Sequence, residues 1–178
     1  METMKLKDSR AVSIRRAQPG DGQGIIDLVN QTDTESRYMT REPGEFTYTL
    51  EQEEALLSRQ GEDRVWFLAV AGDQPVGMCN VDRVHTRARL RHRASLGLVV
   101  LKDWWGQGIG RQLMAHAIAW AQEQGFEQLE LDVIAGNDRA QSLYRSLGFV
   151  EAGRIPKAFK YQDGTYADDV LMVRVLKG

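Results

Sequence analysis

The sequence predicts an α/β protein with a single domain. Its 178 residues suffice for one hydrophobic core, and 42% hydrophobic with 27% charged residues is the composition of an ordinary globular chain. In the second half, patterns typical of strand, helix, strand, helix and strand follow one another, as in α/β folds. Residues 94–101 (ASLGLVVL) are apolar almost without interruption, as expected of a strand that is covered on both faces.

The chain begins with a predicted strand and helix. Residues 1–10 form a polar lead-in, and the alternating pattern at 11–17 (AVSIRRA) predicts the first strand. After a turn at 19–22, Asp21 is expected to cap a helix. That helix carries the apolar residues Ile25, Ile26, Leu28 and Val29.

A second helix and a hairpin come next. Thr49 is expected to open the helix, and Gly61 to stop it. Residues 65–71 and 76–82 are apolar runs separated by a turn sequence, Gly-Asp-Gln-Pro. Together they predict a β-hairpin.

The most basic stretch is RVHTRARLRHRA at residues 83–94. Arginines recur in steps of two from Arg87 to Arg93, so a strand or hairpin arm would present them on one face. No aromatic residues are interleaved with them, and the formal net charge of the chain is −2. We interpret the segment as a solvated hairpin face and expect no nucleic-acid partner.

The rest of the chain alternates between helices and strands. A stripe of apolar residues with helical spacing runs from Ile109 to Ala121. The next strand presents Glu130 and Asp132 on one face. The predicted elements are a helix that ends at Gly125, a strand at 129–134, a short helix capped by Asn137 and closed by Gly148, a strand at 149–155, a turn at Asp163-Gly164 and a strand at 166–176.

Composition and termini predict a cytoplasmic protein. Cys79 is the only cysteine, so intramolecular disulfides are impossible, and its apolar neighbours predict a small buried thiol. The polar N-terminus has no signal-peptide core, and no apolar run reaches the length of a membrane span. His85 and His92 have no cysteine or carboxylate at metal-ligand spacing. We therefore expect no metal and no membrane partner.

The strongest candidate for a binding site is LVVLKDWWGQGIGRQL at residues 98–113. Gly106, Gly108 and Gly110 alternate directly before a predicted helix, and Arg111 follows. Glycine lets backbone N–H groups approach a ligand closely, and the first turn of a helix offers unpaired N–H groups. The pattern therefore indicates a phosphate or pyrophosphate site. It is neither a P-loop, which needs Lys-Ser/Thr, nor the dinucleotide fingerprint, which needs glycine at Arg111.

A second motif, together with the glycine loop, relates the chain to a known family. The block N-x-x-A-x-x-L-Y-x-x-L-G-F occurs without gaps at Asn137–Phe149. An apolar strand, a G-x-G loop and a helix, followed at this spacing by such a block, resemble the GCN5-related N-acetyltransferase (GNAT) superfamily. The resemblance covers residues 10–176 and is specific in 94–150. It implies a mixed sheet of about six or seven strands flanked by about four helices, with a splayed pair of central strands. Trp105 departs from the pattern, because the family usually has Arg or Gln there.

The resemblance implies acetyl-CoA as the acetyl donor. N–H groups of the glycine loop would hold its pyrophosphate, and its pantetheine arm would pair with the preceding strand, which a bulge splays from its neighbour. A backbone N–H near Val100 would stabilise the oxyanion of the tetrahedral intermediate. We expect Trp105 to pack the loop. The implied cofactor-binding residues are Leu98, Val99, Val100, Gly106, Gln107, Gly108, Ile109, Gly110, Arg111, Asn137 and Tyr144.

Two residues are candidates for proton transfer. The resemblance places the phenol of Tyr144 near the sulfur, as a general acid for the leaving thiolate. The attacking amine must be neutral, yet a primary amine with a pKa near 10.4 is only about one part in a thousand neutral near pH 7.4, so a base is useful. Asp132 is the first candidate, although a solvent-facing strand residue fits it equally well. The weaker candidates are Glu130, Glu35 and Glu42.

The expected acceptor is a primary amine of a small molecule, acetylated by direct transfer. By resemblance, segment 31–50 and the C-terminal strands shape its site. The acidic residues of this part of the chain suit a cationic amine by electrostatic complementarity. Solvated surface residues are the alternative explanation for the same acidic pattern. A protein N-terminal or lysine acetyltransferase, which would need an open lip at 31–50, and a non-catalytic acyl-CoA-binding module are the alternatives; a homodimer is compatible with the sequence. The acidic residues are Glu35, Glu42, Glu45, Glu51, Glu53 and Glu54.

Overall fold

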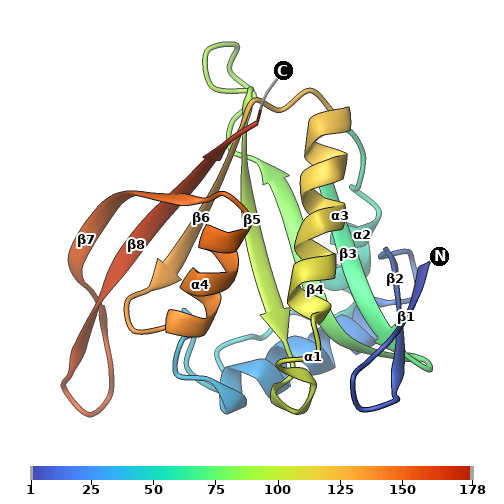
Figure 1. Cartoon of the computed structure of the whole chain (residues 1–178). Helices are drawn as coiled ribbons and strands as arrows, with labels where there is room; N and C mark the ends of the chain where they lie inside the picture. Colours follow the sequence, from blue (N-terminus) through green and yellow to red (C-terminus); the bar gives the residue numbers. More distant parts are fainter. Residues whose placement is uncertain (1, 177–178) are drawn as a thin grey trace.

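A computed structural model describes residues 2–176 as one mixed sheet of eight strands flanked by four α-helices (Figure 1). The strand order is β1-β2-β3-β4-β5-β6-β8-β7. Neighbouring strands are antiparallel except β5 and β6, which are parallel. The predicted α/β class is confirmed. The sheet has one strand more than expected, because β1 lies within the segment predicted as a lead-in.

The strands and helices follow the predicted order closely. No helix described within residues 2–176 is long and apolar enough to cross a bilayer. The strands are β1 (Glu2–Lys5), β2 (Ala11–Arg16), β3 (Arg64–Ala71), β4 (Gln74–Arg83), β5 (Arg93–Val100), β6 (Gln128–Ile134), β7 (Val150–Lys160) and β8 (Tyr166–Val175). The helices are α1 (Gly22–Glu35), α2 (Leu50–Leu57), α3 (Ile109–Glu123) and α4 (Asp138–Ser146), with a short 3-10 turn, η1 (Lys102–Trp104).

Two buried clusters cover opposite faces of the sheet. Phe67 of β3 and Cys79 of β4 lie on the face that α3 covers with Leu113, in the larger cluster. Trp66 and Leu68 of β3 point to the other face, where they pack with α1 and α2. Because α1 and α2 contact mainly the first half of the sheet, the same face is more open over β5, β6 and β8.

The two central strands separate soon after they meet. β5 and β6 pair only from Arg93 opposite Gln128 to Ser95 opposite Glu130, and then diverge (Figure 1). This confirms the predicted splay. The β4–β5 ladder continues to Val100 without a register shift, so the expected bulge is not found in it. Leu98–Val100 are half-buried, because the gap exposes one edge of a strand expected to be covered on both faces.

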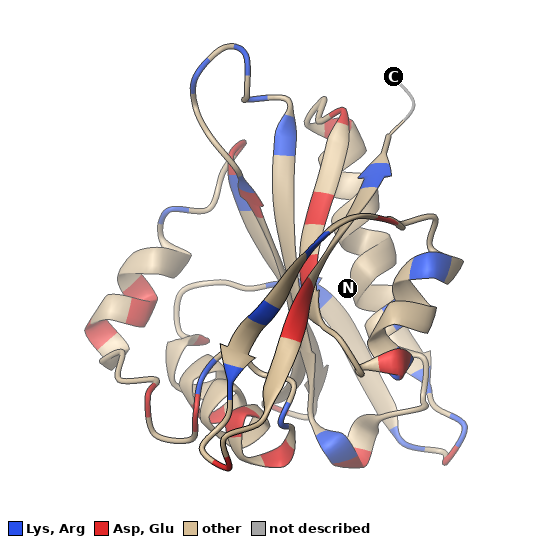
Figure 2. Cartoon of the chain, turned by 90° about the vertical axis from the view of Figure 1, so that its left-hand side faces the viewer, with Lys and Arg blue, Asp and Glu red and all other residues tan. Residues whose placement is uncertain are grey.

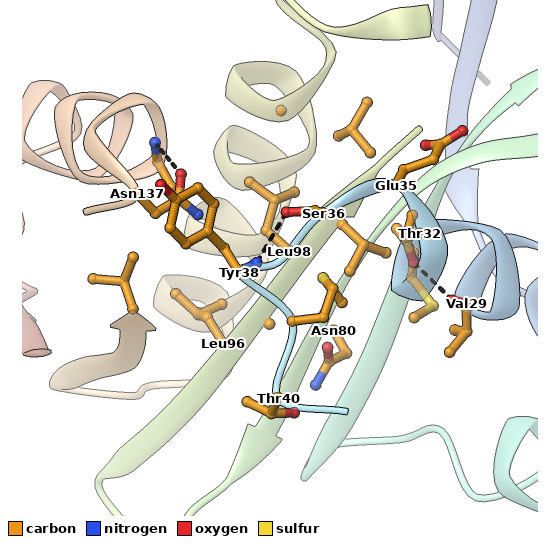
Figure 3. A pocket seen from close by; sticks show the side chains of 18 of the residues that line it. Val29, Thr32, Glu35, Ser36, Tyr38, Thr40, Asn80, Leu96, Leu98 and Asn137 are labelled. Atoms are coloured by element: carbon orange, nitrogen blue, oxygen red, sulfur yellow. Dashed lines mark hydrogen bonds between the residues drawn. The ribbon is translucent and has the colours of Figure 1, made fainter. Parts of the chain in front are cut away.

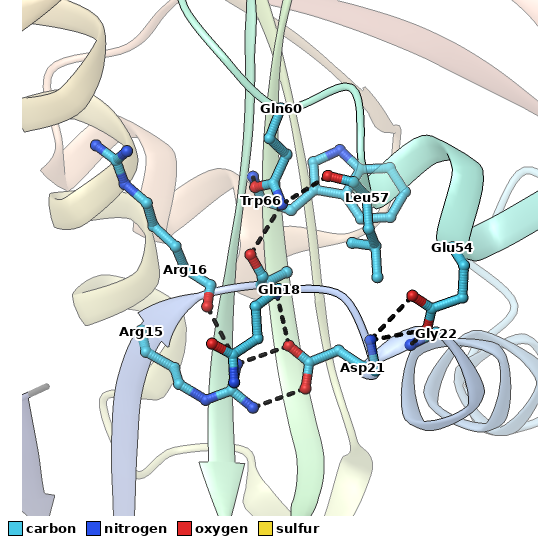
Figure 4. A network of polar contacts seen from close by, with 11 residues as sticks. Arg15, Arg16, Gln18, Asp21, Gly22, Glu54, Leu57, Gln60 and Trp66 are labelled. Carbon is cyan, nitrogen blue, oxygen red and sulfur yellow. Dashed lines mark hydrogen bonds and ion pairs between the residues drawn. The ribbon is translucent and has the colours of Figure 1, made fainter.

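The start of α1 is capped by another helix (Figure 4). Asp21, the predicted cap, makes no capping hydrogen bond and instead binds the Arg15 guanidinium at 2.6 and 2.7 Å. The Glu54 carboxylate accepts hydrogen bonds from the N–H groups of Gly20 and Gly22, at 2.9 and 2.8 Å. Thr49 caps α2 through a capping box, as predicted.

The basic segment is a loop that projects from the sheet (Figure 2). Residues 84–92 contain turns and no strand, so the predicted single face of alternating arginines is wrong up to Arg91. Arg93 alone of the series lies in a strand, where it pairs with Glu130. Arginines spaced by two residues do not by themselves specify a strand. The residues between them would also have to be buried on the other face of that strand.

Candidate functional site

A cavity of about 880 Å³ extends from the gap between β5 and β6 to α1 and α2. Strand, loop and helix residues that the sequence pointed to meet on its wall. Gln107 is the exception: its side chain accepts a hydrogen bond from the Lys7 N–H at 3.1 Å and does not line the cavity. The predicted residues that line it are Leu98, Val99, Val100, Gly106, Gly108, Ile109, Gly110, Arg111, Asp132, Asn137 and Tyr144.

The glycine loop needs its glycines for two different reasons. Gly106 and Gly108 have φ values of 74° and 86°, in the left-handed region that favours glycine, and open space surrounds both. Gly110 permits close packing, since a Cβ there would lie 3.3 Å from Leu143 and 3.4 Å from Leu98. Gly108 directly precedes α3, so the unpaired N–H groups of the first helical turn face the cavity end of the loop.

Trp105 packs against the loop and the strand before it. Its indole Nε1–H donates to the Val100 carbonyl at 2.6 Å. The Arg139 guanidinium stacks on the ring, 3.2 Å from its centroid. A carbonyl oxygen has two lone pairs, so one remains on Val100. The sequence analysis did not single out Arg139, although it lies inside the second motif and lines the cavity.

Asn137 and Tyr144 lie on the α4 side of the gap. The Asn137 side-chain oxygen caps α4 by accepting from the Ala140 N–H at 3.3 Å, and its amide lies at the cavity wall (Figure 3). Tyr144 is 7% exposed and packs beside Phe149. Burial raises the pKa of the Tyr144 phenol, so the phenol keeps its proton throughout the physiological range.

Two aspartates of β6 and β8 line the cavity from the face of the sheet opposite α3 and α4. Asp132 is exposed on β6, and Asp169 of β8 lies diagonally across the ladder on the same face. Partial desolvation raises the pKa of Asp132, with a further contribution from Glu130. Desolvation and the Asp132 charge raise the pKa of Asp169, whose Oδ1 is buried without a hydrogen-bond partner. A raised pKa suits a carboxylate that must take up a proton near neutral pH.

Glu130, a weaker candidate base, is held by an ion pair. Its carboxylate accepts from Arg93 Nη2 at 2.7 Å and from Gln128 Nε2 at 3.0 Å. The Arg93 guanidinium lowers the pKa of Glu130, so this carboxylate is a poor proton acceptor. Among the described residues 2–176, no three His, Cys, Asp or Glu side chains are grouped so that they could hold a metal ion.

The acidic residues of the second quarter of the chain have different positions. Glu35 accepts a hydrogen bond from the Lys102 N–H at 2.7 Å, and Glu54 caps α1. Glu42 and Glu51 do not line the cavity, whereas Glu45 does. Glu53 also lines the cavity, yet its side chain is buried. A uniformly solvated acidic surface is therefore wrong for this segment.

Residues 36–48, which we call the covering segment, close one side of the cavity (Figure 3). Arg41 anchors this segment to α1 through two hydrogen bonds to the buried Asp33, at 2.9 and 3.1 Å. Tyr38 reaches the turn after β6, since a Cβ at Gly136 would lie 3.6 Å from its hydroxyl. The segment therefore bridges the two halves of the sheet.

Asn80 forms the floor of the cavity, together with Gly97. The two residues face each other in the β4–β5 ladder, and a Cβ at Gly97 would overlap the Asn80 side-chain oxygen. The Asn80 amide donates to Asp82 at 2.8 Å, which fixes its orientation. Only strand register reveals this pair, so the sequence analysis missed it, as it missed Asp169.

Comparisons with known proteins agree with this arrangement. The model of the acetyltransferase (GNAT) family matches residues 27–149. A peptidyl-lysine N-acetyltransferase of Escherichia coli, YjaB, is 28% identical over 144 residues, covering 80% of this chain and 85% of that protein. An aminoglycoside N(6')-acetyltransferase type 1 of Stenotrophomonas maltophilia is 31% identical over 94 residues, 50% of this chain and 61% of the relative. This chain thus matches less than two thirds of the aminoglycoside enzyme.

Among solved structures, a GNAT-family acetyltransferase of Streptococcus pneumoniae superposes with a TM-score of 0.88. It is 28% identical in sequence, and the match covers 93% of this chain and 99% of that chain. The similarity therefore extends over nearly the whole fold, well beyond the two motifs.

Proposed function

Because the chain belongs to the GNAT family of acetyltransferases, which use acetyl-CoA, we propose that it acetylates a primary amine of a small molecule by direct transfer. The observation that supports this most is the division of the cavity. The glycine loop, Asn137 and Tyr144 lie with α3 and α4 on one face of the sheet. Asp132 and Asp169 point to the opposite face, because their strand neighbours Leu131, Val133 and Val170 pack against α3.

The glycine-loop side fits acetyl-CoA. The unpaired N–H groups at the start of α3 can hold a pyrophosphate, and the open space at Gly106 and Gly108 admits one. The unpaired edge of β5 beyond Ser95 offers backbone groups to an amide-rich arm. When bound, acetyl-CoA supplies an activated acetyl group as a thioester.

The residues around the gap have complementary roles in the proposed reaction. Asp132, with its raised pKa, accepts a proton from the ammonium form of the acceptor, directly or through water. The charge of Asp132 in turn raises the pKa of Asp169, its neighbour on the same face. The buried phenol of Tyr144 remains protonated and can donate its proton to a leaving thiolate. A β5 backbone N–H near Val100 stabilises negative charge that develops on the carbonyl oxygen.

The covering segment favours a small acceptor over a peptide. Its contacts through Arg41 and Tyr38 close the side of the cavity where a protein substrate would need an open groove. The lining includes Glu45, Glu53 and the two aspartates, and the Arg41 guanidinium of the covering segment is paired with Asp33. This negative surface complements a positively charged amine.

The test is thiol release from acetyl-CoA over a panel of small amines, a lysine-containing peptide and a peptide with a free N-terminal amine. We expect turnover with small amines and much slower release with either peptide. Transfer to peptides alone would overturn the small-molecule proposal. Tight CoA binding without release for any amine would indicate a binding module instead.

A further inference from the structure

A buried carboxyl without a partner lines the cavity where α2 covers it. Glu53 of α2 is 1% exposed and lines the cavity. Within residues 2–176, no side chain or backbone group donates a hydrogen bond to its carboxylate, and no cation pairs with it. Isolation of a carboxyl from water without a hydrogen bond is unfavourable, so such a group calls for an explanation.

The neighbours of Glu53 cannot supply that partner. Glu53 and Leu57 are one helical turn apart on the same face of α2, and Leu57 packs in the same buried cluster as Trp66. The neighbouring charge of Glu54 is also negative, and the Arg41 guanidinium over Phe46 is already paired with Asp33. Apolar and aromatic side chains form most of the wall here: Ile25, Val29, Phe46, Leu56, Trp66 and Met78.

Such a wall suits the cationic end of an apolar chain. Aromatic faces attract ammonium groups, and Trp66 lines this end of the cavity, whereas Phe46 already contacts Tyr48 at 5.1 Å and the Arg41 guanidinium at 5.4 Å from its ring centroid. The methylenes of a ligand would contact the apolar side chains, and its terminal nitrogen would donate to the carboxylate. The ligand would then supply the cation that pairs with the Glu53 carboxylate.

The sheet sets the separation between this end and the gap. Trp66 faces Asn80, and Asn80 faces Gly97, in consecutive ladders. Neighbouring strands are about 4.8 Å apart and residues along a strand about 3.4 Å apart, so Trp66 lies roughly 10 Å from Gly97 and roughly 14 Å from Val100, three residues farther along β5, where transfer is proposed. A ligand that reaches both places therefore needs an extended chain.

On the basis of the proposed function, we propose that the acceptor is a linear aliphatic diamine. One nitrogen lies at the gap beside Asp132, and the second, positively charged nitrogen binds Glu53. The intervening methylenes occupy the apolar part of the cavity. The carboxylate thus selects the acceptor by its remote charge and takes no part in the acetyl transfer.

The experiment compares α,ω-diaminoalkanes of increasing length with n-alkylamines of the same length. The wild type should prefer the diamine, with the largest diamine-to-alkylamine ratio of kcat/KM at a chain that spans roughly 10–14 Å. Glu53→Gln should lower that ratio roughly 10- to 100-fold, the usual effect of one charge-assisted hydrogen bond, mainly through KM. Thermal unfolding of the variant checks that it is folded.

Glu51→Gln is the matched control. It makes the same substitution in the same helix, at an exposed position outside the cavity, and should leave the ratio unchanged. Equal kcat/KM for diamines and alkylamines, or an unchanged ratio in Glu53→Gln, would overturn the inference while turnover of amines still supports the proposed function. No turnover of any amine would instead refute the proposed function itself.

Discussion

Substitution of Gly97 by alanine tests the floor of the cavity directly. The three atoms nearest to a Cβ at this position belong to the Asn80 side chain, and the closest of them would overlap it. Asn80 must then rotate, which breaks the 2.8 Å hydrogen bond that its amide donates to Asp82. Asp82 keeps its ion pair with Arg64, so it is not left unpaired.

The magnitude follows from that lost bond. A hydrogen bond to a charged group contributes about 1.5–3 kcal/mol, and partial exposure of Asp82 places Gly97→Ala near the lower half, about 1–2 kcal/mol. For a chain of this length, each kcal/mol lowers Tm by about 2–4 °C. The rotated amide also enters the cavity, so kcat/KM for the acceptor should fall more than that for acetyl-CoA.

A double-mutant cycle, measured by chemical and thermal unfolding, isolates the contact. An Asn80→Ala background removes the three atoms nearest to the added methyl group, so Gly97→Ala should then change stability by less than about 0.5 kcal/mol. Gly153→Ala, in strand β7 with open space around its Cβ, is the control for adding a methyl group to a strand. If Gly97→Ala is as stable as this control, or if its effect persists without Asn80, the assigned contact is wrong.

Four further predictions follow from the site. Tyr144→Phe should lower kcat with little change in acetyl-CoA affinity; an unchanged kcat across the pH range would remove Tyr144 as the acid. The negative charge of Glu130 contributes to the raised pKa of Asp132, so Glu130→Gln should move the acidic limb of kcat/KM to lower pH, and a limb that stays or moves upward contradicts the assignment of Asp132 as base. Gly108→Ala should lower stability by about 1–2 kcal/mol and raise KM for acetyl-CoA. Gly125→Ala, at a similar positive φ outside the cavity, should lower stability alone. Equal KM values for acetyl-CoA in the two variants would contradict the assignment of Gly108 to the cofactor site. Burial raises the pKa of Cys79 to about 12, so the thiol should resist alkylation near pH 8 until the protein unfolds, and rapid labelling of the native protein would contradict this burial.

Local sequence patterns were sufficient to predict those elements whose stabilising interactions are local in the chain. The capping box of Thr49 and the Asn137 cap involve groups within three residues, so the sequence reveals both helix starts. Apolar periodicity likewise placed α3, and β6 within one residue. Asp21 failed as a cap because its competitor, Arg15, comes from a neighbouring strand, and Glu54 reaches the N–H groups from a different helix.

The sequence by itself determined the fold class, the glycine loop and the identity of the family, because each depends on residues close together in the chain. The tertiary structure determined which residues form the acceptor side of the cavity. Asp169 joins Asp132, and Asn80 joins Gly97, only through strand register. Glu53 differs from the exposed Glu51 because packing turns one face of α2 inward. Desolvation acts on a carboxylate according to what surrounds it in space, and the residues adjacent in sequence do not specify those surroundings.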